Sequence, residues 1–319
     1  MYLEEIRMKK ISIVSSCYNE ELNLDELYRR VTAQFEDLKD KYEFEYVLAD
    51  NGSTDNTANK LKEIAQKDSR FKIIINSRNF GHIKSPFNAI LSTNSDAVIS
   101  IASDLQDPPE LIPELIKKWE EGNKVVLLQK IVSEESPIIF AIRKLYYYVL
   151  SKIADNGVEL AQNCTGSGLI DRCVVDYLKK TDDPYPYYRG LVCEVGFDRA
   201  YVQFNQPKRK NGITANNFYT LYDMAMTGLV KNSKLPLRFM AILGFIMSMI
   251  TFLISIIYLV WKLLNWNTFS FGIAPIIISI TFLGAIQLFC LGILGEYIAA
   301  IYTRVDKKPL VAEKERINF

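Results

Sequence analysis

Two long segments without a charged side chain limit what this chain can fold into. One runs from Phe239 to Trp261, and the other, from Leu263 to Gly295, is continuously apolar from about Phe271. About 20 apolar helical residues suffice to cross the hydrocarbon core of a bilayer. Long helices buried in a soluble protein, the alternative, normally carry charge on one face. We therefore expect a hairpin of two transmembrane helices, over about residues 238–262 and 271–297.

Basic residues flank both segments and predict their orientation. They are Lys231, Lys234 and Arg238 before the first, and Arg304, Lys307 and Lys308 after the second. Because such residues gather on the cytoplasmic side, we expect both termini there. This divides the chain into a cytoplasmic domain over residues 1–235, a membrane part over 236–304 and a cytoplasmic tail over 305–319. The charges within the first ten residues do not fit a signal peptide.

The composition argues against several classes of function. With 38 basic and 37 acidic residues the net charge is +1, so we expect no nucleic-acid partner. The five cysteines have no zinc-type spacing and the chain has a single histidine, which argues against a zinc site. A reducing, cytoplasm-facing compartment fits this cysteine pattern best.

Short β-branched runs alternate with longer amphipathic stretches from Lys10 to Gln129. This pattern predicts an α/β fold with a mainly parallel sheet flanked by helices. The expected strands are Ile11–Ser15, Phe44–Ala49, Phe71–Asn76, Ala97–Ile101 and Lys124–Leu128. The expected helices lie near Leu22–Leu38, Thr57–Lys67, Ser85–Leu91 and Leu111–Glu120.

Two amphipathic segments follow, near residues 138–155 and 216–232. The first carries Arg143 and Lys144 among aromatic and aliphatic residues, and the second has a similar pattern. Both are typical of helices that lie on a membrane surface. Packing against a soluble core is an equally good explanation of the first.

Polar loops follow the first four expected strands. They are Ser15–Glu21, Asp50–Asp55, Ser77–His82 and Ser103–Glu110. In a parallel α/β sheet, ligands bind at the carboxyl ends of the strands, where loops and helix N-termini meet. Asn, Asp, Gly and Ser also dominate ordinary turns, but four such loops after consecutive strands favour a binding site.

The fourth loop contains the oxygen ligands Asp104, Gln106 and Asp107. They suit Mg²⁺ or Mn²⁺ and not zinc. Such an ion usually bridges protein oxygens to phosphates, so the loop predicts a nucleotide diphosphate ligand. The chain has neither GxxxxGKS/T nor GxGxxG, which argues against P-loop hydrolysis and dinucleotide redox chemistry.

Six motifs resemble those of the polyprenyl-phosphate glycosyltransferases of family 2. They are CYNEE (Cys17–Glu21), DNGSTDNT (Asp50–Thr57), SRNFGH (Ser77–His82), DLQDPPE (Asp104–Glu110), RGLVCEVGF (Arg189–Phe197) and LGEYIAAIY (Leu294–Tyr302). They occur in the right order over nearly the whole chain, and DLQDPPE is the most specific. The resemblance implies a GT-A fold and inverting transfer of a sugar from a nucleotide donor to a lipid phosphate. It also implies homo-oligomers, often tetramers, in a bacterial plasma membrane.

The resemblance implies roles for individual residues. Asp50 resembles the residue that binds the donor base, and Asp104 with Gln106 resembles the ligands of the metal and diphosphate. Arg209 resembles the arginine of a mobile RxxG segment that closes over the donor and the lipid phosphate; attraction of this basic run to anionic lipid is an alternative. The catalytic candidates are Asp104, Asp107 and Arg209. Further nucleotide-binding candidates are Ser15, Asn19, Glu20, Asn51, Ser53, Arg78 and Ser103. The candidates for the acceptor phosphate are Arg143, Lys144, Arg189, Lys208 and Arg209.

Three positions depart from the family pattern in ways that affect the site. Asn51 replaces the second Asp of DDGS, Ala102 replaces the first Asp of DxD, and TGSGLIDR (Thr165–Arg172) replaces TGDFRL. The metal shell is therefore thinner, and the acidic residue of the last segment has no certain counterpart. A lipid phosphate is already largely ionised at neutral pH, because its second pKa is about 6, so its attack requires no strong general base.

Together these features predict transfer of a hexose or N-acetylhexosamine from a nucleotide sugar, UDP-linked by preference, to undecaprenyl phosphate. The product would supply lipid-linked sugar for cell-surface glycans. A processive polysaccharide synthase is disfavoured, because QxxRW is absent and two spans are too few for a channel. The non-enzyme alternative is a membrane-anchored scaffold that binds nucleotide and whose catalytic site has decayed, as Ala102 and Ser167 suggest.

Overall fold

The computed structural model describes residues 7–131, 164–207, 226, 230, 234–264, 273–306 and 308–319. The expected surface helix near residues 138–155 and most of that near 216–232 lie outside these residues. So do four of the candidate ligands, Arg143, Lys144, Lys208 and Arg209.

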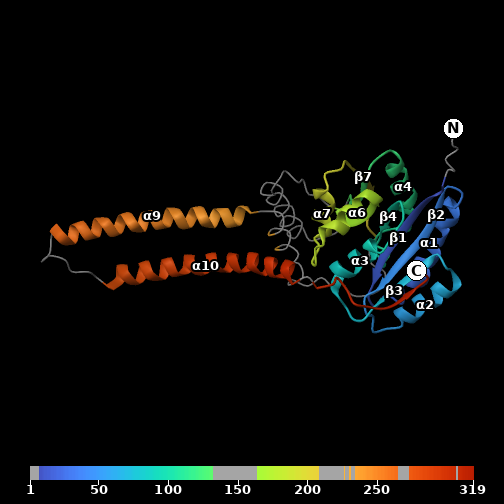
Figure 1. Cartoon of the computed structure of the whole chain (residues 1–319), viewed down its shortest axis with the longest axis horizontal. Coiled ribbons are helices and arrows are strands. Elements are labelled where there is room, and N and C mark those ends of the chain that lie inside the picture. Colours follow the sequence, from blue (N-terminus) through green and yellow to red (C-terminus); the bar gives the residue numbers. More distant parts are fainter. Residues whose placement is uncertain are drawn as a thin grey trace.

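An eight-stranded sheet forms the centre of the first domain, in the order β7-β5-β6-β4-β1-β2-β3-β8 (Figure 1). Its strands are β1 (Lys9–Cys17), β2 (Tyr42–Asp50), β3 (Phe71–Asn76), β4 (Ala97–Ser100), β5 (Val125–Lys130), β6 (Cys164–Asp171), β7 (Arg199–Phe204) and β8 (Glu313–Ile317). Strands β4, β1, β2 and β3 run parallel, as do β5 and β7, whereas β6 and β8 are antiparallel to their neighbours. The five expected strands and the mainly parallel α/β fold are confirmed.

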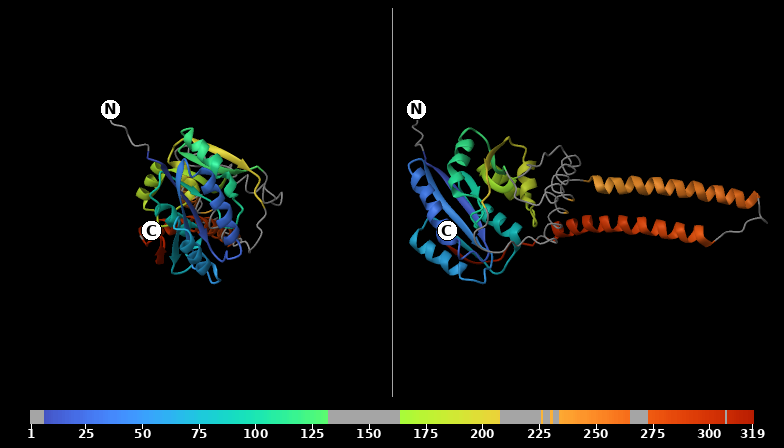
Figure 2. Two further views of the ribbon diagram at one scale, coloured as in Figure 1. Left: turned by 90° about the vertical axis from the view of Figure 1, so that its right-hand side faces the viewer. Right: turned by 180° about the vertical axis from the view of Figure 1, so that it is seen from behind.

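Helices cover both faces of this sheet (Figure 2). One face packs against α1 (Leu24–Leu38), α2 (Thr57–Lys67) and α4 (Ile112–Glu120), and the other against α3 (Gly81–Leu91), α6 (Arg172–Thr181) and α7 (Tyr188–Glu194). Successive strand residues point to opposite faces, so Ile13 joins the first cluster and Val14 the second. Burial on both faces explains why the central strands are nearly continuous apolar runs.

The apolar segments form two helices, α9 (Leu235–Leu264) and α10 (Ile273–Val305), which lie side by side and project away from the sheet (Figures 1 and 2). Each is long and apolar enough to cross a membrane. Large apolar side chains lie on their surface, and Phe245 and Leu288 are 70% and 72% exposed. Soluble proteins rarely expose apolar patches of this extent. Helix α10 continues to Val305, beyond the expected end at residue 297, since Glu296 does not interrupt it.

The end of the chain, expected only as a tail, adds an edge strand to the sheet. β8 pairs with β3, with Ile317 opposite Ile73. Polar contacts hold it there: Lys62 pairs with Glu315 at 2.5 Å, and the Asn318 side chain donates to the carbonyls of Ala65 and Phe71. The helix that ends the hairpin is thereby connected to the sheet again.

Candidate active site

The carboxyl ends of β4, β1, β2 and β3 lie side by side, which brings the four polar loops to one edge of the sheet. At this edge Cys17 of β1 lies opposite Asp50 of β2, and the hydroxyl of Ser103 in the fourth loop donates to the carbonyl of Ser16, next to Cys17, at 3.0 Å. Burial, with the nearby Asp50 charge, raises the pKa of the Cys17 thiol above its usual range. The second and fourth loops therefore meet around Cys17, as the strand order requires.

The first and second loops are tied together by Asn19. Its backbone N–H donates to Ser53 Oγ at 3.0 Å, and its side-chain oxygen accepts from the N–H of Thr54 at 2.8 Å. Asn19 adopts a left-handed conformation, with φ of 55°, which Asn tolerates better than most residues. The predicted ligands Asn19 and Ser53 are thus brought together at the loop edge.

Asp50 lies directly beneath these contacts and is buried. Burial raises its pKa above the usual range, and hydrogen bonds from Ser53 and Gly52 oppose that rise. The N–H of Ser53 is 3.3 Å from both carboxylate oxygens, which is long for a hydrogen bond. The carboxylate therefore retains acceptor capacity for a ligand.

The side chain of Asn51 connects the second loop to the third. Its nitrogen donates to Asn79 Oδ1 at 3.0 Å and to the Gly81 carbonyl at 3.1 Å, while its oxygen accepts from the N–H of Phe80 at 2.9 Å. These contacts give Asn51 a loop-positioning role and occupy the groups that nucleotide binding would need. They also explain why an amide, which can donate, stands where the family pattern has a carboxylate.

The second and third loops pack in direct backbone contact at Gly52. A Cβ atom there would lie 2.4 Å from the carbonyl carbon of Arg78, and Gly52 has φ of +73°. The Arg78 side chain is exposed and lies over the ring of Phe80, with 4.0 Å between guanidinium carbon and ring centroid. Arg78 therefore remains at the surface of the predicted nucleotide site.

Two other predicted nucleotide ligands are buried and bonded internally. Ser15 donates to the Ile101 carbonyl at 2.7 Å and contacts Tyr46 Oη at 2.7 Å. Glu20 accepts from the side chain of Asn23 at 2.5 Å. Both residues shape the loops, and the structure does not bring either side chain to the open edge.

The fourth loop places two carboxylates close together. Asp104 is half-buried and accepts from the N–H of Gln106 at 3.1 Å, in a turn in which Leu105 has φ of 63°. Asp107 is buried, and burial raises its pKa, to which the charge of Asp104 also contributes. Its Oδ2 accepts from the N–H of Ala102 at 3.1 Å. Its Oδ1 is buried and, among the described residues, has no hydrogen-bond partner.

These oxygens fit a divalent cation. A buried carboxylate oxygen without a hydrogen-bond partner among the described residues, in a loop that also carries Asp104 and the amide of Gln106, is the type of donor that Mg²⁺ and Mn²⁺ prefer. Within the described ranges no cluster of three or more His, Cys, Asp or Glu side chains suited to a metal occurs. The thin metal shell expected from Ala102 stays a prediction.

Strand β6 contributes Ser167, which from the sequence alone is only a sign of a decayed catalytic site. The hydroxyl of Ser167 donates to Asp107 Oδ2 at 2.5 Å, across 60 residues of sequence. Nearby, Arg189 Nη2 donates to the Thr165 carbonyl at 2.7 Å, so this predicted acceptor ligand lies next to the same strand. In the sequence, the one sign of this contact was the TGSG segment, which stands where the family pattern has TGDFRL.

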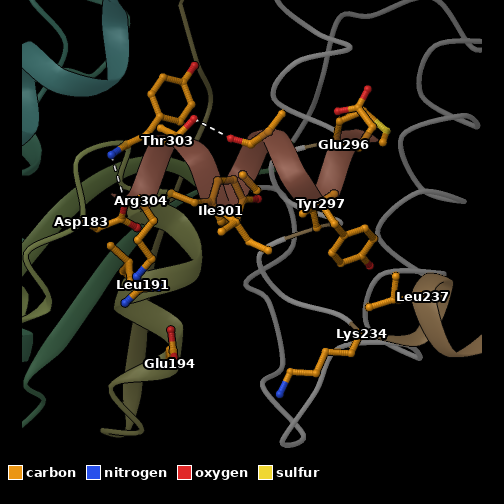
Figure 3. Close-up of a pocket in the computed structure, with 16 residues that line it drawn as sticks. Asp183, Leu191, Glu194, Lys234, Leu237, Glu296, Tyr297, Ile301, Thr303 and Arg304 are labelled. Carbon is orange, nitrogen blue, oxygen red and sulfur yellow. Dashed lines mark hydrogen bonds between the residues drawn. The ribbon is translucent and has the colours of Figure 1, made fainter. Parts of the chain in front are cut away.

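A cavity of about 730 Å³ lies where α7 faces the domain-side ends of α9 and α10 (Figure 3). Its lining combines Leu191 and Glu194 of RGLVCEVGF with Glu296 and Tyr297 of LGEYIAAIY. The basic residues Lys234 and Arg304 also line it. Two motifs far apart in the sequence therefore form one cavity between the sheet domain and the apolar hairpin.

Comparisons with known proteins agree with these features. Residues 12–166 match the family model described as "Glycosyl transferase family 2". The bactoprenol glucosyl transferase of Shigella phage SfX is 33% identical, with 96% of this chain and 99% of that protein covered. The glycosyltransferase YkcC of Bacillus subtilis is 35% identical, with 94% and 91% covered. Among solved structures, glucosyl-3-phosphoglycerate synthase from Mycobacterium tuberculosis with Mg²⁺ and UDP has a TM-score of 0.46 at 18% identity, with 70% of this chain and 77% of that chain covered.

The similarity to the bactoprenol enzyme extends over nearly the full length of both chains, hairpin included. The chain therefore belongs to glycosyltransferase family 2, among the polyprenyl-phosphate glycosyltransferases.

Proposed function

We propose that this enzyme transfers one hexose or N-acetylhexosamine, with inversion, from a nucleotide sugar, UDP-linked by preference, to undecaprenyl phosphate. The reaction would take place at the cytoplasmic face of a bacterial plasma membrane. The observation that carries the proposal is in the fourth loop, where an Asp107 oxygen without a hydrogen-bond partner in the described ranges lies near Asp104 at the loop edge of the sheet. The names of the bactoprenol relatives support the lipid acceptor.

The donor would bind along the four-loop edge. Asp50 retains acceptor capacity suited to the N–H of a planar base, and Asn19, Ser53 and Arg78 lie at the surface near it. Asp104 and Gln106, with Asp107, would hold Mg²⁺ or Mn²⁺, which when bound neutralises charge on the diphosphate leaving group.

The acceptor would approach from the hairpin. A polyprenyl chain keeps its phosphate at the membrane interface, and the cavity beside α10 combines apolar walls with Lys234 and Arg304. The carboxylates of Asp183, Glu194 and Glu296 line the same cavity. Arg189, fixed against β6, would help to orient the phosphate nearer the site. Return of the chain to the sheet through β8 supports both ends of the hairpin being on one side of the membrane. We also propose a homo-oligomer, on the family resemblance.

The chemistry requires positioning more than proton transfer. The acceptor oxygen is already an anion at neutral pH and attacks the anomeric carbon, while the bond to the nucleotide diphosphate breaks. Alignment of the two anions makes the reaction effectively unimolecular, which contributes on the order of 7–11 kcal/mol. Fixed charges near the diphosphate stabilise the transition state further.

The test uses the full-length protein in lipid nanodiscs with undecaprenyl phosphate, Mg²⁺ or Mn²⁺, and a panel of labelled nucleotide sugars. Label should partition into organic solvent, and Asp104→Ala should abolish it. Asp25→Ala is the matched control, because Asp25 is an exposed carboxylate of α1 that pairs with Lys60. Label that survives Asp104→Ala would reject the site. Long polymers would favour a processive synthase, and donor binding without turnover would favour the scaffold.

A further inference from the structure

The carboxylate of Asp107 is held by two hydrogen bonds on the same oxygen. Oδ2 accepts from the N–H of Ala102 at 3.1 Å and from the hydroxyl of Ser167 at 2.5 Å. Oδ1 has no hydrogen-bond partner among the described residues. One oxygen is therefore fixed, and the other has no partner in the described part of the chain.

The backbone of β6 makes Ser167 the side chain that reaches Asp107. At Gly168 a Cβ atom would lie 2.1 Å from the Val126 carbonyl oxygen, and at Gly166 it would lie 2.9 Å from Nε of Arg189. Both glycines have positive φ, +147° and +88°. The N–H of Ser167 also donates to Thr165 Oγ1 at 3.2 Å. Ser167 is thus presented between two positions that side chains cannot readily occupy.

A second hydroxyl–carboxylate pair in the same sheet shows what a structural pair looks like. Ser12 donates to Glu45 Oε1, also at 2.5 Å and also buried. There the other oxygen is neutralised by Lys10 and Lys72, at 2.7 Å and 2.9 Å. Among the described residues, Asp107 has no such ion pair: the charge of Asp104 raises its pKa, and the charge of Lys130, a smaller effect, lowers it. A purely structural carboxylate would be expected to have its charge compensated.

We propose that Ser167 is a positioning residue for Asp107, orienting its carboxylate for the transfer reaction. The inference rests on the proposed function. In this chain the TGSG segment then acts on the site through the hydroxyl of Ser167, which is bonded to Asp107. In the family pattern the same segment carries an acidic residue instead.

The test compares Ser167→Ala and Ser167→Thr with Ser12→Ala in the full-length protein. Ser167→Ala should lower kcat about tenfold with the donor KM unchanged, since misorientation affects the transition state more than ground-state binding. Ser167→Thr, which keeps the hydroxyl, should restore most of the rate. Ser12→Ala removes the same type of bond and should lower the melting temperature without lowering kcat. Wild-type kcat in Ser167→Ala would overturn the proposal.

A double-mutant cycle with Asp107→Asn tests the pair directly. If Ser167 acts through Asp107, Ser167→Ala should have little further effect on kcat in the Asp107→Asn background, and independent losses would overturn the proposal. The same cycle in unfolding free energy does not depend on turnover. If the wild-type protein labels no lipid with any donor, the proposed function fails. In that case zero coupling in unfolding would reject the inference separately.

Discussion

The side-chain nitrogen of Asn51 lies 3.1 Å from the carbonyl oxygen of Gly81 and donates to it, which ties the second loop of the site to the third. The same nitrogen donates to Asn79, so one amide organises the turn that precedes α3. The loop edge is therefore built largely from side chains that bind one another, and fewer of them are free for a ligand than the sequence motifs suggest.

Asn51→Asp should destabilise the protein even though it restores the family pattern. The carboxylate cannot donate, and it would lie against the oxygens of Asn79 and Gly81. We expect the free energy of unfolding to fall by about 2–3 kcal/mol, with no gain in transfer rate. Urea denaturation measures this, and Asn59→Asp is the control because Asn59 is exposed. Equal stability of the two variants would contradict the role assigned to Asn51.

Gly52→Ala should separate the second and third loops. The new methyl group would overlap the backbone of Arg78, and the positive φ adds about 1–2 kcal/mol of strain. Gly122→Ala is the matched control, because Gly122 also has positive φ, +102°, but has nothing within 4 Å of its Cβ position. Calorimetric titration should show weaker donor binding for Gly52→Ala alone. Similar donor affinity in both variants would indicate that the contact does not matter.

Removal of residues 312–319 should expose the edge of β3 and loosen the third loop. The deletion removes the pairing of Ile317 with Ile73 and the hydrogen bond from Ser77 N–H to the Ala312 carbonyl, at 2.9 Å. Hydrogen exchange should become faster at Ser77 and at the β3 amides that face β8. Arg316→Ala is the control, since its exposed pair with Glu313 contributes little. Unchanged exchange in the deletion variant would argue against a structural role of β8.

Because of Asp171, the free energy of unfolding should fall as the solution becomes acidic. Burial alone would raise the pKa of Asp171, but hydrogen bonds from Trp119, Lys124 and Cys173 lower it to about 2. Because this pKa lies below the unfolded value, the stabilisation is present above about pH 4 and is lost as the pH falls towards 2, with a total of about 2 kcal/mol. Urea denaturation from pH 2 to pH 6 should show this slope, and Asp171→Asn should remove it. Asp176→Asn, at an exposed carboxylate, should retain it.

The sequence predicted the elements that depend on local patterns. Strands β1 to β5 are apolar runs buried on both faces, and the apolar hairpin follows from length and the absence of charge. It did not predict β8, because EKERI is charged and becomes a strand only through partners such as Lys62 and Ile73.

The predictions for the site show the same division. The four polar loops lie together because they follow the carboxyl ends of neighbouring parallel strands, as expected, whereas the binding roles of Asn19, Asp50, Ser53 and Asp104 stay predictions. The contact between Ser167 and Asp107 depends on how β6 inserts between β4 and β5, which no local pattern specifies. For the same reason, motif residues such as Asn51 could not be distinguished from ligands before their partners were known.

The return of the chain through β8 sets how the sheet can move relative to the hairpin. Helix α9 begins at Leu235. Helix α10 ends at Val305, and β8 begins shortly afterwards at Glu313. The two helices run antiparallel, so the start of α9 and the end of α10 both lie on the side of the sheet domain (Figure 1). Insertion of residues into α10 would change both the reach and the orientation of the connection to β8, since each added helical residue advances the chain by about 1.5 Å and turns it by about 100°.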